Sequence, residues 1–240
     1  METIFISDLH LDKTRPNVIN YFIKFIENQS VTMDNLYILG DFVESWVGDD
    51  DPAVGVTDAF ELLKSISKTT KIYFMHGNRD FMISSKICDK YGMELIEDPT
   101  IVNLYNRRIL LMHGDTLCVD DIKYQEFRQL VRNKSWQLQM MEKPLEERLM
   151  IADELRNKSM GETTHKNEFI MDVNEEEVKK CFRDSGAEII IHGHTHRPMI
   201  HEVKIGNRKY KRVVLGDWGS KSHVIILNEN DFELKEIQFT

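Results

Sequence analysis

The sequence lacks the features of a disulfide-stabilised or membrane-spanning protein. Its three cysteines are odd in number and far apart, with no Cys-x-x-Cys spacing, which favours reduced thiols in a cytosolic protein. No basic-then-apolar leader opens the chain, and no uncharged apolar run approaches the roughly 20 residues needed to cross a bilayer. We therefore expect a soluble protein, with attachment to a membrane surface left open.

The sequence also lacks an excess of positive charge. Its 31 Lys and Arg residues are outnumbered by 40 Asp and Glu residues, which gives a net charge of −9. A protein that binds nucleic acid by neutralising phosphates should be basic overall or along one face, so no nucleic-acid partner is expected. No repeat, low-complexity segment or linker divides the 240 residues, and no obligate protein partner is inferred.

Short apolar runs alternate with segments of helical periodicity in the first third of the chain. Strands are expected at 3–6, 36–39 and 71–75, and amphipathic helices at 16–27 and 58–67. This order predicts parallel βαβ units, so the loops that follow the strands should all leave the carboxyl edge of one sheet.

The rest of the chain is expected to contain more strands and a helical insert. Further strands are expected at 100–104, 108–112, 188–191, 223–227 and 232–239, with a two-residue hairpin turn at Gly206-Asn207. Helices are expected at 84–91 and from Asn174, as N-cap, through Phe182. Residues 121 to about 159 have a helical pattern rich in methionine and large apolar residues, with Arg and Lys interspersed. This stretch therefore looks inserted between two β segments.

Ligand-type side chains follow five of the expected strands, usually beside a glycine. They are Asp8-x-His10, Gly40-Asp41, Gly77-Asn78-Arg79, His113-Gly114 and Gly193-His194-Thr195-His196. A carboxylate at the end of a buried strand must be solvated, paired or metal-bound. Asp, Asn and His together suit borderline divalent ions, and the lack of thiolates argues against structural zinc. Seven candidate ligands exceed the needs of one ion, so the set predicts two ions bridged by a carboxylate, as in centres for phosphoryl chemistry.

Each histidine taken alone is more often a hydrogen-bonded core or surface residue than a ligand. The coincidence of five such strand ends in one chain favours metal binding. His76 and His192 lie within the ends of their strands, so packing or hydrogen bonding next to the ligands is expected of them.

The order DLH, GD, GNRD, HGD and GHTH resembles that of the calcineurin-like metallophosphoesterases, over nearly the whole chain. The longer strings YILGD, WVGDDDP, HGNRDF, MHGDTLC and IHGHTHRP resemble the UDP-2,3-diacylglucosamine hydrolases of lipid A biosynthesis. The resemblance implies an α/β fold whose central β-sandwich of two mixed sheets is flanked by helices. It also implies a single domain, 1–240, in which a helical insert at about 121–168 caps a dimetal site.

The resemblance further implies the roles of individual residues. One Mn²⁺ is expected on Asp8, His10, Asp41 and His196, and a second on Asp41, Asn78, His113 and His194, with Asp41 as the bridge. Catalytic roles fall on Asn78, Arg79, His113 and His194. Substrate contacts fall on Asn78, Arg79, Asp121, Ser159, Thr163, Lys166 and His194. Thr163 stands where the family usually has an amide, whose reach threonine lacks.

The activity implied by the resemblance is hydrolysis of a pyrophosphate bond. A hydroxide that bridges two Mn²⁺ ions attacks the phosphorus nearer uridine of UDP-2,3-diacylglucosamine, giving UMP and 2,3-diacylglucosamine 1-phosphate. The expected location is cytoplasmic, peripheral on the inner membrane. One alternative is an enzyme of the same fold that acts on a soluble nucleotide pyrophosphate or a phosphodiester. Another is a non-catalytic binding scaffold, which the presence of all seven ligands disfavours.

Arg79 and the insert are expected to select the substrate. Arg79 stays charged and cannot act as a general acid, but its guanidinium can neutralise a phosphate-monoester leaving group. The Met-rich insert suits acyl chains, and the alternative is that its apolar stripe packs on the core. A second basic group is formed by Lys204, Arg208, Lys209, Lys211 and Arg212, for which contact with anionic lipid and a solvated surface are both open.

Overall fold

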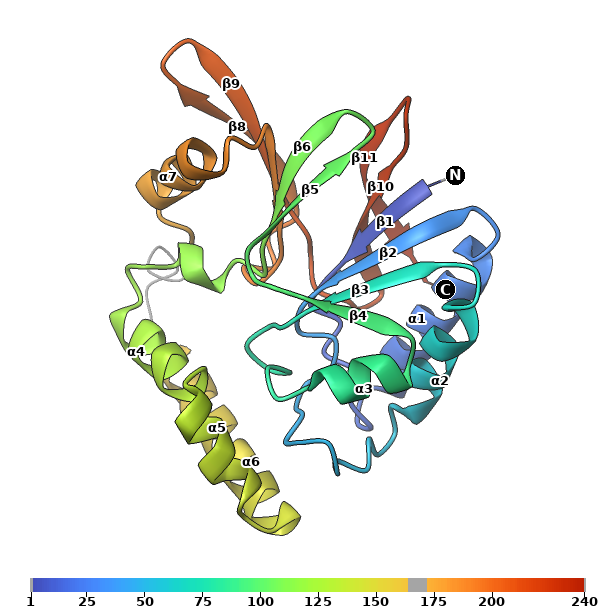
Figure 1. The fold of residues 1–240 in the computed structure, drawn as a ribbon, viewed down its shortest axis with the longest axis vertical. Coiled ribbons are helices and arrows are strands. Elements are labelled where there is room, and N and C mark those ends of the chain that lie inside the picture. The colour runs from blue at the N-terminus through green and yellow to red at the C-terminus, as the bar shows by residue number, and fades with distance from the viewer. Residues whose placement is uncertain (1, 164–171, 240) are drawn as a thin grey trace.

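The computed structural model describes residues 2–163 and 172–239, and for residues 158–163 the backbone alone (Figure 1). The strands of this part of the chain are β1 (Glu2–Ile6), β2 (Met33–Leu39), β3 (Lys71–Met75), β4 (Met93–Ile96), β5 (Thr100–Leu104), β6 (Arg107–Leu111), β7 (Ile189–His192), β8 (Met199–Ile205), β9 (Arg208–Val214), β10 (Lys221–Leu227) and β11 (Phe232–Gln238). The α-helices are α1 (Pro16–Gln29), α2 (Thr57–Ile66), α3 (Ser85–Lys90), α4 (Ile122–Val131), α5 (Lys134–Met141), α6 (Leu145–Thr163) and α7 (Glu175–Ser185).

The strands form two mixed sheets that face each other. The order in the six-stranded sheet is β11-β10-β1-β2-β3-β4, with β1 to β4 parallel and β10 and β11 antiparallel. The order in the five-stranded sheet is β5-β6-β7-β9-β8, in which β6, β7 and β9 are parallel. The expected α/β fold with two mixed sheets and flanking helices is confirmed.

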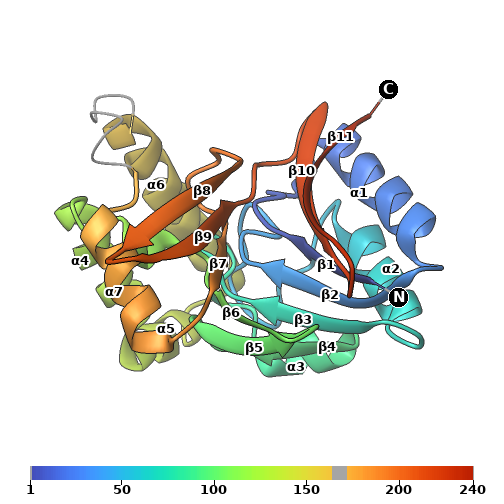
Figure 2. The ribbon, with the colours of Figure 1, turned by 90° about the horizontal axis from the view of Figure 1, so that it is seen from above.

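Three apolar layers hold the sandwich together. Side chains such as Phe5, Leu39 and Ile191 fill the space between the sheets. The outer face of the six-stranded sheet packs against α1, α2 and α3, whose periodic apolar residues include Phe22 and Phe60. The outer face of the five-stranded sheet packs against α7 (Figures 1 and 2). Asn174 caps α7 as expected, because its side chain accepts hydrogen bonds from two backbone N–H groups of the first turn.

Two features differ from the sequence-based expectation. The prediction that all ligand-bearing loops leave the carboxyl edge of one sheet is wrong. The loops after β1, β2 and β3 leave one sheet, whereas those after β6 and β7 leave the other. The strand β4 was not expected, because four residues at a sheet edge give little periodicity. It forms through parallel pairing with β3, in which Met93 lies opposite Ile72.

The insert consists of α4, α5 and α6, between β6 and β7. These helices extend away from both sheets (Figure 1). Several of their large apolar side chains are exposed, among them Ile122, Leu138 and Met150. Among the described residues, we find no helix with the length and apolar character required to cross a bilayer.

Candidate metal centre and the adjoining pocket

The predicted ligands gather where the two sheets meet. Asp8 and His10 follow β1, Asp41 follows β2, and Asn78 follows β3. From the second sheet, His113 follows β6, and His194 and His196 follow β7. Parallel strands place their carboxyl ends together, so the docking of two parallel segments brings all five loops to one place.

The backbone at these positions is unusual. Positive φ angles occur at Asp8 (55°), His10 (49°), Asp41 (53°), His194 (65°) and His196 (54°). A residue with a Cβ in this region costs of order 1–3 kcal/mol, and such conformations concentrate at functional sites. Five of the seven predicted ligands therefore have a backbone conformation that local preferences disfavour.

Two glycines allow the loops to approach each other. A Cβ at Gly77 would lie 2.1 Å from Asp41 Oδ1, and a Cβ at Gly193 would lie 2.1 Å from Asp8 Oδ2. Both distances are far below van der Waals contact. Any side chain at these positions would displace a carboxylate of the site.

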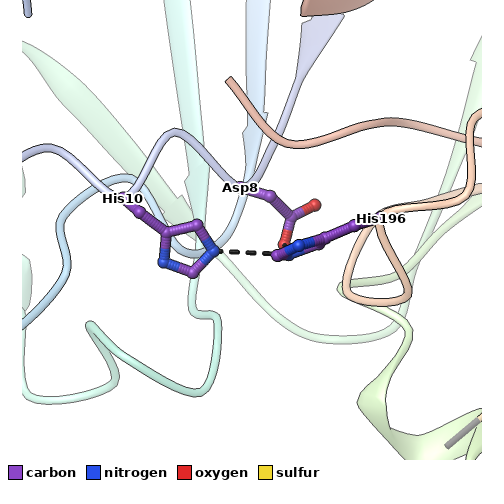
Figure 3. A group of neighbouring side chains, drawn as sticks. All are labelled: Asp8, His10 and His196. Atoms are coloured by element: carbon purple, nitrogen blue, oxygen red, sulfur yellow. Dashed lines mark hydrogen bonds and ion pairs between the residues drawn. The ribbon is translucent and has the colours of Figure 1, made fainter. Parts of the chain in front are cut away.

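One cluster contains Asp8, His10 and His196 (Figure 3). The Nε2 atoms of the two imidazoles are 3.3 Å apart, and Asp8 Oδ1 is 3.3 Å from His196 Nε2. Two imidazole nitrogens and a carboxylate oxygen that face one point form the kind of donor set that a divalent cation binds. The residues present thus fit a metal ion.

A second cluster contains Asn78, His113 and His194. The Asn78 Oδ1 atom lies 3.0 Å from His113 Nε2 and 2.9 Å from His194 Nδ1. The clusters meet at Asp41, because its Oδ2 atom lies 3.7 Å from His10 Nε2 and 3.8 Å from His113 Nε2. One carboxylate oxygen thus lies between imidazoles of both clusters. Asp8 is also close enough to group with Asp41 and His113.

Neighbouring groups fix the orientation of the ligands. His113 Nδ1 donates to the carbonyl of Leu39 at 2.9 Å, which leaves Nε2 directed at the cluster. The backbone N–H of His194 donates to both oxygens of Asp8, at 3.1 and 3.0 Å. His10 Nδ1 lies 2.9 Å from Glu44 Oε2. Partners of this kind set the tautomer and the basicity of metal-binding histidines.

The two histidines of the second cluster differ electrostatically. Burial alone would lower the pKa of His113, but the carboxylates of Asp41, Asp115 and Asp8 outweigh it and raise the pKa to about 9. Burial, followed by the charge of His113, lowers the pKa of His194 to about 4. The dense negative charge around His113 is a local field that a divalent cation would neutralise.

Arg79 lies at the edge of the centre. Its backbone N–H donates to Asp41 Oδ1 at 2.8 Å, and its Nη1 lies 3.8 Å from Glu44 Oε1. The Nε atom is buried without a hydrogen-bond partner among the described residues. The guanidinium therefore retains donors next to the carboxylate of Asp41.

An apolar pocket adjoins Asn78 and Arg79. Its other lining residues come from the loop after β2, the loop after β3 and the insert, and include Trp46, Phe81, Phe127, Trp136, Met140 and Leu155. The insert is attached to the core beside this pocket, since Arg128 Nε donates to Asp115 Oδ2 at 2.7 Å and Arg132 donates to the carbonyl of Gly77 at 2.7 Å. The pocket thus places apolar surface directly beside the ligand clusters.

The predicted substrate residues of the insert are only partly described. Asp121 is the N-cap of α4, where its side chain accepts from the N–H of Tyr124 at 3.2 Å. Ser159 and Thr163 lie on α6, but their side chains, and all of Lys166, lie outside the described residues.

Sequence reasoning did not identify Glu44 or Tyr124. Glu44 contacts both His10 and Arg79, and Tyr124 donates to Asp115 at 2.7 Å while its ring lies 5.6 Å from that of His194. Neither residue belongs to a strand-end pattern. Asp115 could be seen in the sequence as the Asp of the HGD string. The sequence did not show that its partners come from the insert.

Comparison with known proteins places these features in a family. The family model of the calcineurin-like phosphoesterases matches residues 1–198. A UDP-2,3-diacylglucosamine hydrolase from Marinobacter nauticus is 45% identical over 219 residues, covering 91% of this chain and 90% of that protein. One from Yersinia pseudotuberculosis is 42% identical over 240 residues and covers 100% of both chains. The solved structure of a novel archaeal phosphodiesterase, 14% identical with a TM-score of 0.52 and 100% of both chains covered, shares the fold.

Proposed function

Because this chain belongs to the calcineurin-like phosphoesterase family, we propose that it is a metal-dependent hydrolase of UDP-2,3-diacylglucosamine. The products are UMP and 2,3-diacylglucosamine 1-phosphate, a step of lipid A biosynthesis. Relatives with that name are 42–45% identical over at least nine-tenths of their length. The observation that carries the proposal is the position of Asp41, whose Oδ2 atom lies between imidazoles of two ligand clusters.

The proposed ligands follow from the two clusters. Asp8, His10, Asp41 and His196 would hold one ion, and Asp41, Asn78, His113 and His194 the other. The mixed oxygen and nitrogen donors suit Mn²⁺, which we propose as the physiological ion. Two bound ions supply Lewis acidity to a phosphoryl oxygen and a hydroxide near neutral pH.

The residues around the clusters orient the reacting groups. Leu39 and Asp8 fix His113 and His194 through the hydrogen bonds described above. Arg79 would bind the departing phosphate, because its charged fork matches two phosphate oxygens and it lies beside the bridging carboxylate. A phosphate-monoester leaving group needs neutralisation of charge more than a proton. The positive charge and the paired donors of the guanidinium serve that need.

The lipid part of the substrate is assigned to the apolar pocket. Burial of acyl chain yields about 0.8 kcal/mol per CH₂, so a pocket lined by Trp136, Met140 and Leu155 would favour acylated ligands. Asp121, Ser159, Thr163 and Lys166 remain our candidates for polar contacts from the insert. We treat residues 1–240 as one domain, with the insert at about 121–168 as its lid.

Attachment to the cytoplasmic face of the inner membrane is a further part of the proposal. The insert exposes apolar side chains such as Leu138 and Met150, and Lys134 is exposed on the same helix as Leu138. Apolar side chains beside lysine suit the surface of an anionic leaflet. A lipid substrate would be extracted at that surface.

The decisive experiment compares substrates that differ in their acyl chains. Purified protein with Mn²⁺ should release UMP from UDP-2,3-diacylglucosamine, and should lose most of its kcat/KM when both acyl chains are removed. Equal rates with soluble UDP-sugars would favour the alternative of a nucleotide pyrophosphatase. No hydrolysis of any phosphoester would favour a binding scaffold.

The role of the insert has its own test. Removal of 121–166 should abolish turnover of the diacylated substrate, and Trp136→Ala should raise KM for it while hydrolysis of a small chromogenic phosphodiester is retained. Full activity of both variants on the lipid would contradict the assignment of the pocket.

A further inference from the structure

A groove is lined by residues of α7, β8 and β9. Figure 1 shows where these elements lie. The volume of the groove is about 510 Å³. The charged and titratable residues that line it are Arg212, Lys179, Lys204, His201, Glu175 and Glu202. None of them is a candidate ligand of the metal centre or a predicted substrate contact. The groove is therefore a separate feature of the molecule.

Arg212 forms the base of this groove. It lies on β9, is 8% exposed, and is paired in register with His201 of β8, so both side chains share one face of the sheet. Burial lowers the pKa of Arg212, but a guanidinium remains charged in proteins. A buried positive charge is costly unless a negative group compensates it.

The neighbours of Arg212 do not supply that negative charge. Its Nη1 donates to His192 Nε2 at 3.1 Å, so the side chain that it contacts is an imidazole, which carries no negative charge. His192 Nδ1 donates to the carbonyl of Gly193 at 2.8 Å, which leaves Nε2 as the acceptor. Among the described residues, no carboxylate lies within 4.0 Å of the guanidinium.

The nearest carboxylates are engaged elsewhere. Asp172 attracts Arg212 at longer range, but its Oδ2 atom pairs with Arg197 at 2.7 Å. Glu202 pairs with Lys209 at 3.0 Å. Glu175 is exposed at the start of α7. On the other side, Lys179 pairs with Glu176 at 2.7 Å. The groove thus presents three cations, of which Arg212 and Lys204 have no ion-pair partner among the described residues, against one carboxylate, Glu175, that also has none.

We propose that this groove is a binding site for a small phosphate-bearing anion. Arg212 would anchor the phosphate from the base of the groove, and Lys179 and Lys204 would contact it from the rim. A guanidinium fork binds two phosphate oxygens at once, and an ammonium group adds a mobile donor. The anion would supply a counter-charge to the buried guanidinium.

The ring of His201 gives a local test by NMR. In the full chain loaded with diamagnetic Zn²⁺ in place of paramagnetic Mn²⁺, inorganic phosphate should shift the His201 imidazole signals in a saturable way and raise the pKa of His201, since an anion favours its protonated form. Phosphate bound at the metal centre would instead be reported by His194. The two sites are thereby distinguished.

Substitutions distinguish the specific role of Arg212 from a general effect of positive charge. Arg212→Gln should weaken the His201 response at least about tenfold, and Lys179→Gln should weaken it by a smaller factor. Arg208→Gln is the matched control, because Arg208 is exposed on the same strand and outside the groove. It should leave the response unchanged.

Two probes distinguish the source of the phosphate. A saturable response to inorganic phosphate supports a soluble anion, and a response only to vesicles containing phosphatidylglycerol supports a lipid headgroup. No response of His201 to either probe would overturn the proposal. So would an Arg212→Gln variant with the wild-type response. If that variant does not fold, equal responses of Lys179→Gln and Arg208→Gln would overturn it instead.

Discussion

Asp8, Asp41 and His194 have a left-handed backbone conformation. We attribute this conformation to the geometry of the site and not to the stability of the fold. Neither carboxylate gains local stability from this conformation, which costs of order 1–3 kcal/mol per residue. The surrounding loops impose it, because Gly77 and Gly193 leave just enough room for the two carboxylates. Substitution of a ligand should therefore empty the site without unfolding the sandwich.

Asp41→Asn tests this separation at the proposed bridge. The amide retains the size of the side chain and an oxygen for the N–H of Arg79, but it loses the negative charge between His10 and His113. We expect fewer than two ions per chain by elemental analysis and a fall in UMP release of at least about 100-fold. The circular dichroism spectrum should be unchanged.

The exposed Asp49 of the neighbouring loop provides the control for this substitution. Asp49→Asn changes the net charge equally and should retain both the metal content and the rate. Two tightly bound ions in Asp41→Asn would show that Asp41 is not the bridge.

Arg79→Lys tests the proposed contact with the leaving group. Lysine preserves the charge but cannot donate two parallel hydrogen bonds to a phosphate. We expect kcat to fall about tenfold or more, with a smaller change in KM, because the contact strengthens as charge develops on the leaving oxygen. Arg183→Lys, an exposed site on α7, is the control. Near-normal turnover of Arg79→Lys would refute this role.

Among the helices and strands, those with a clear local pattern of apolar residues were predicted from the sequence. The buried strands β1, β2 and β3 were recognisable from apolar runs that end in Asp, His or Asn, and the helices from their periodicity. The strand β4 was not, because MELI forms a strand only through pairing with β3. Glu44 and Tyr124 also escaped prediction, since their contacts with His10 and His194 depend on tertiary structure that spacing does not reveal.

A buried arginine of α6 also connects the insert to the core beside the pocket. Arg148 of α6 is 2% exposed, and its guanidinium donates to the carbonyl of Val47 at 2.6 Å and to the carboxylate of Asp50. Val47 lines the pocket. The position of Arg148 therefore helps to set the width of the space between the insert and the core.

Arg148→Ala should loosen this connection. Asp50 is 57% exposed, so it remains solvated when its partner is removed, and the expected loss is about 1–3 kcal/mol in the free energy of unfolding from the lost hydrogen bonds. KM for the diacylated substrate should rise more than kcat falls. Denaturant titration and steady-state kinetics measure the two effects. Lys86→Ala, exposed on α3, should change neither, and an Arg148→Ala variant with unaltered stability and KM would exclude this role.

For the molecule as a whole, the candidate site lies where the two sheets meet and takes its residues from both of them. Asp8, Asp41 and Asn78 belong to loops of one sheet, and His113, His194 and His196 to loops of the other. If all the ligand-bearing loops left one sheet, as expected from the sequence, every ligand would come from that sheet. If the proposed ligands are correct, a bound ion would connect the two sheets, and its binding free energy would add to the stability of the sandwich.

Removal of metal should therefore destabilise the entire fold and not only stop catalysis. A ligand that binds the native state alone stabilises it by about 2.7 kcal/mol at 100 times its Kd, so the Tm should fall on dialysis against EDTA and rise again with added Mn²⁺. Differential scanning calorimetry measures both steps. Asp41→Asn, which should bind fewer ions, serves as the comparison and should show a smaller rise with Mn²⁺. If the metal content fell while the Tm stayed constant, the ions would not connect the two sheets, and the proposed ligand sets would have to be redrawn within one of them.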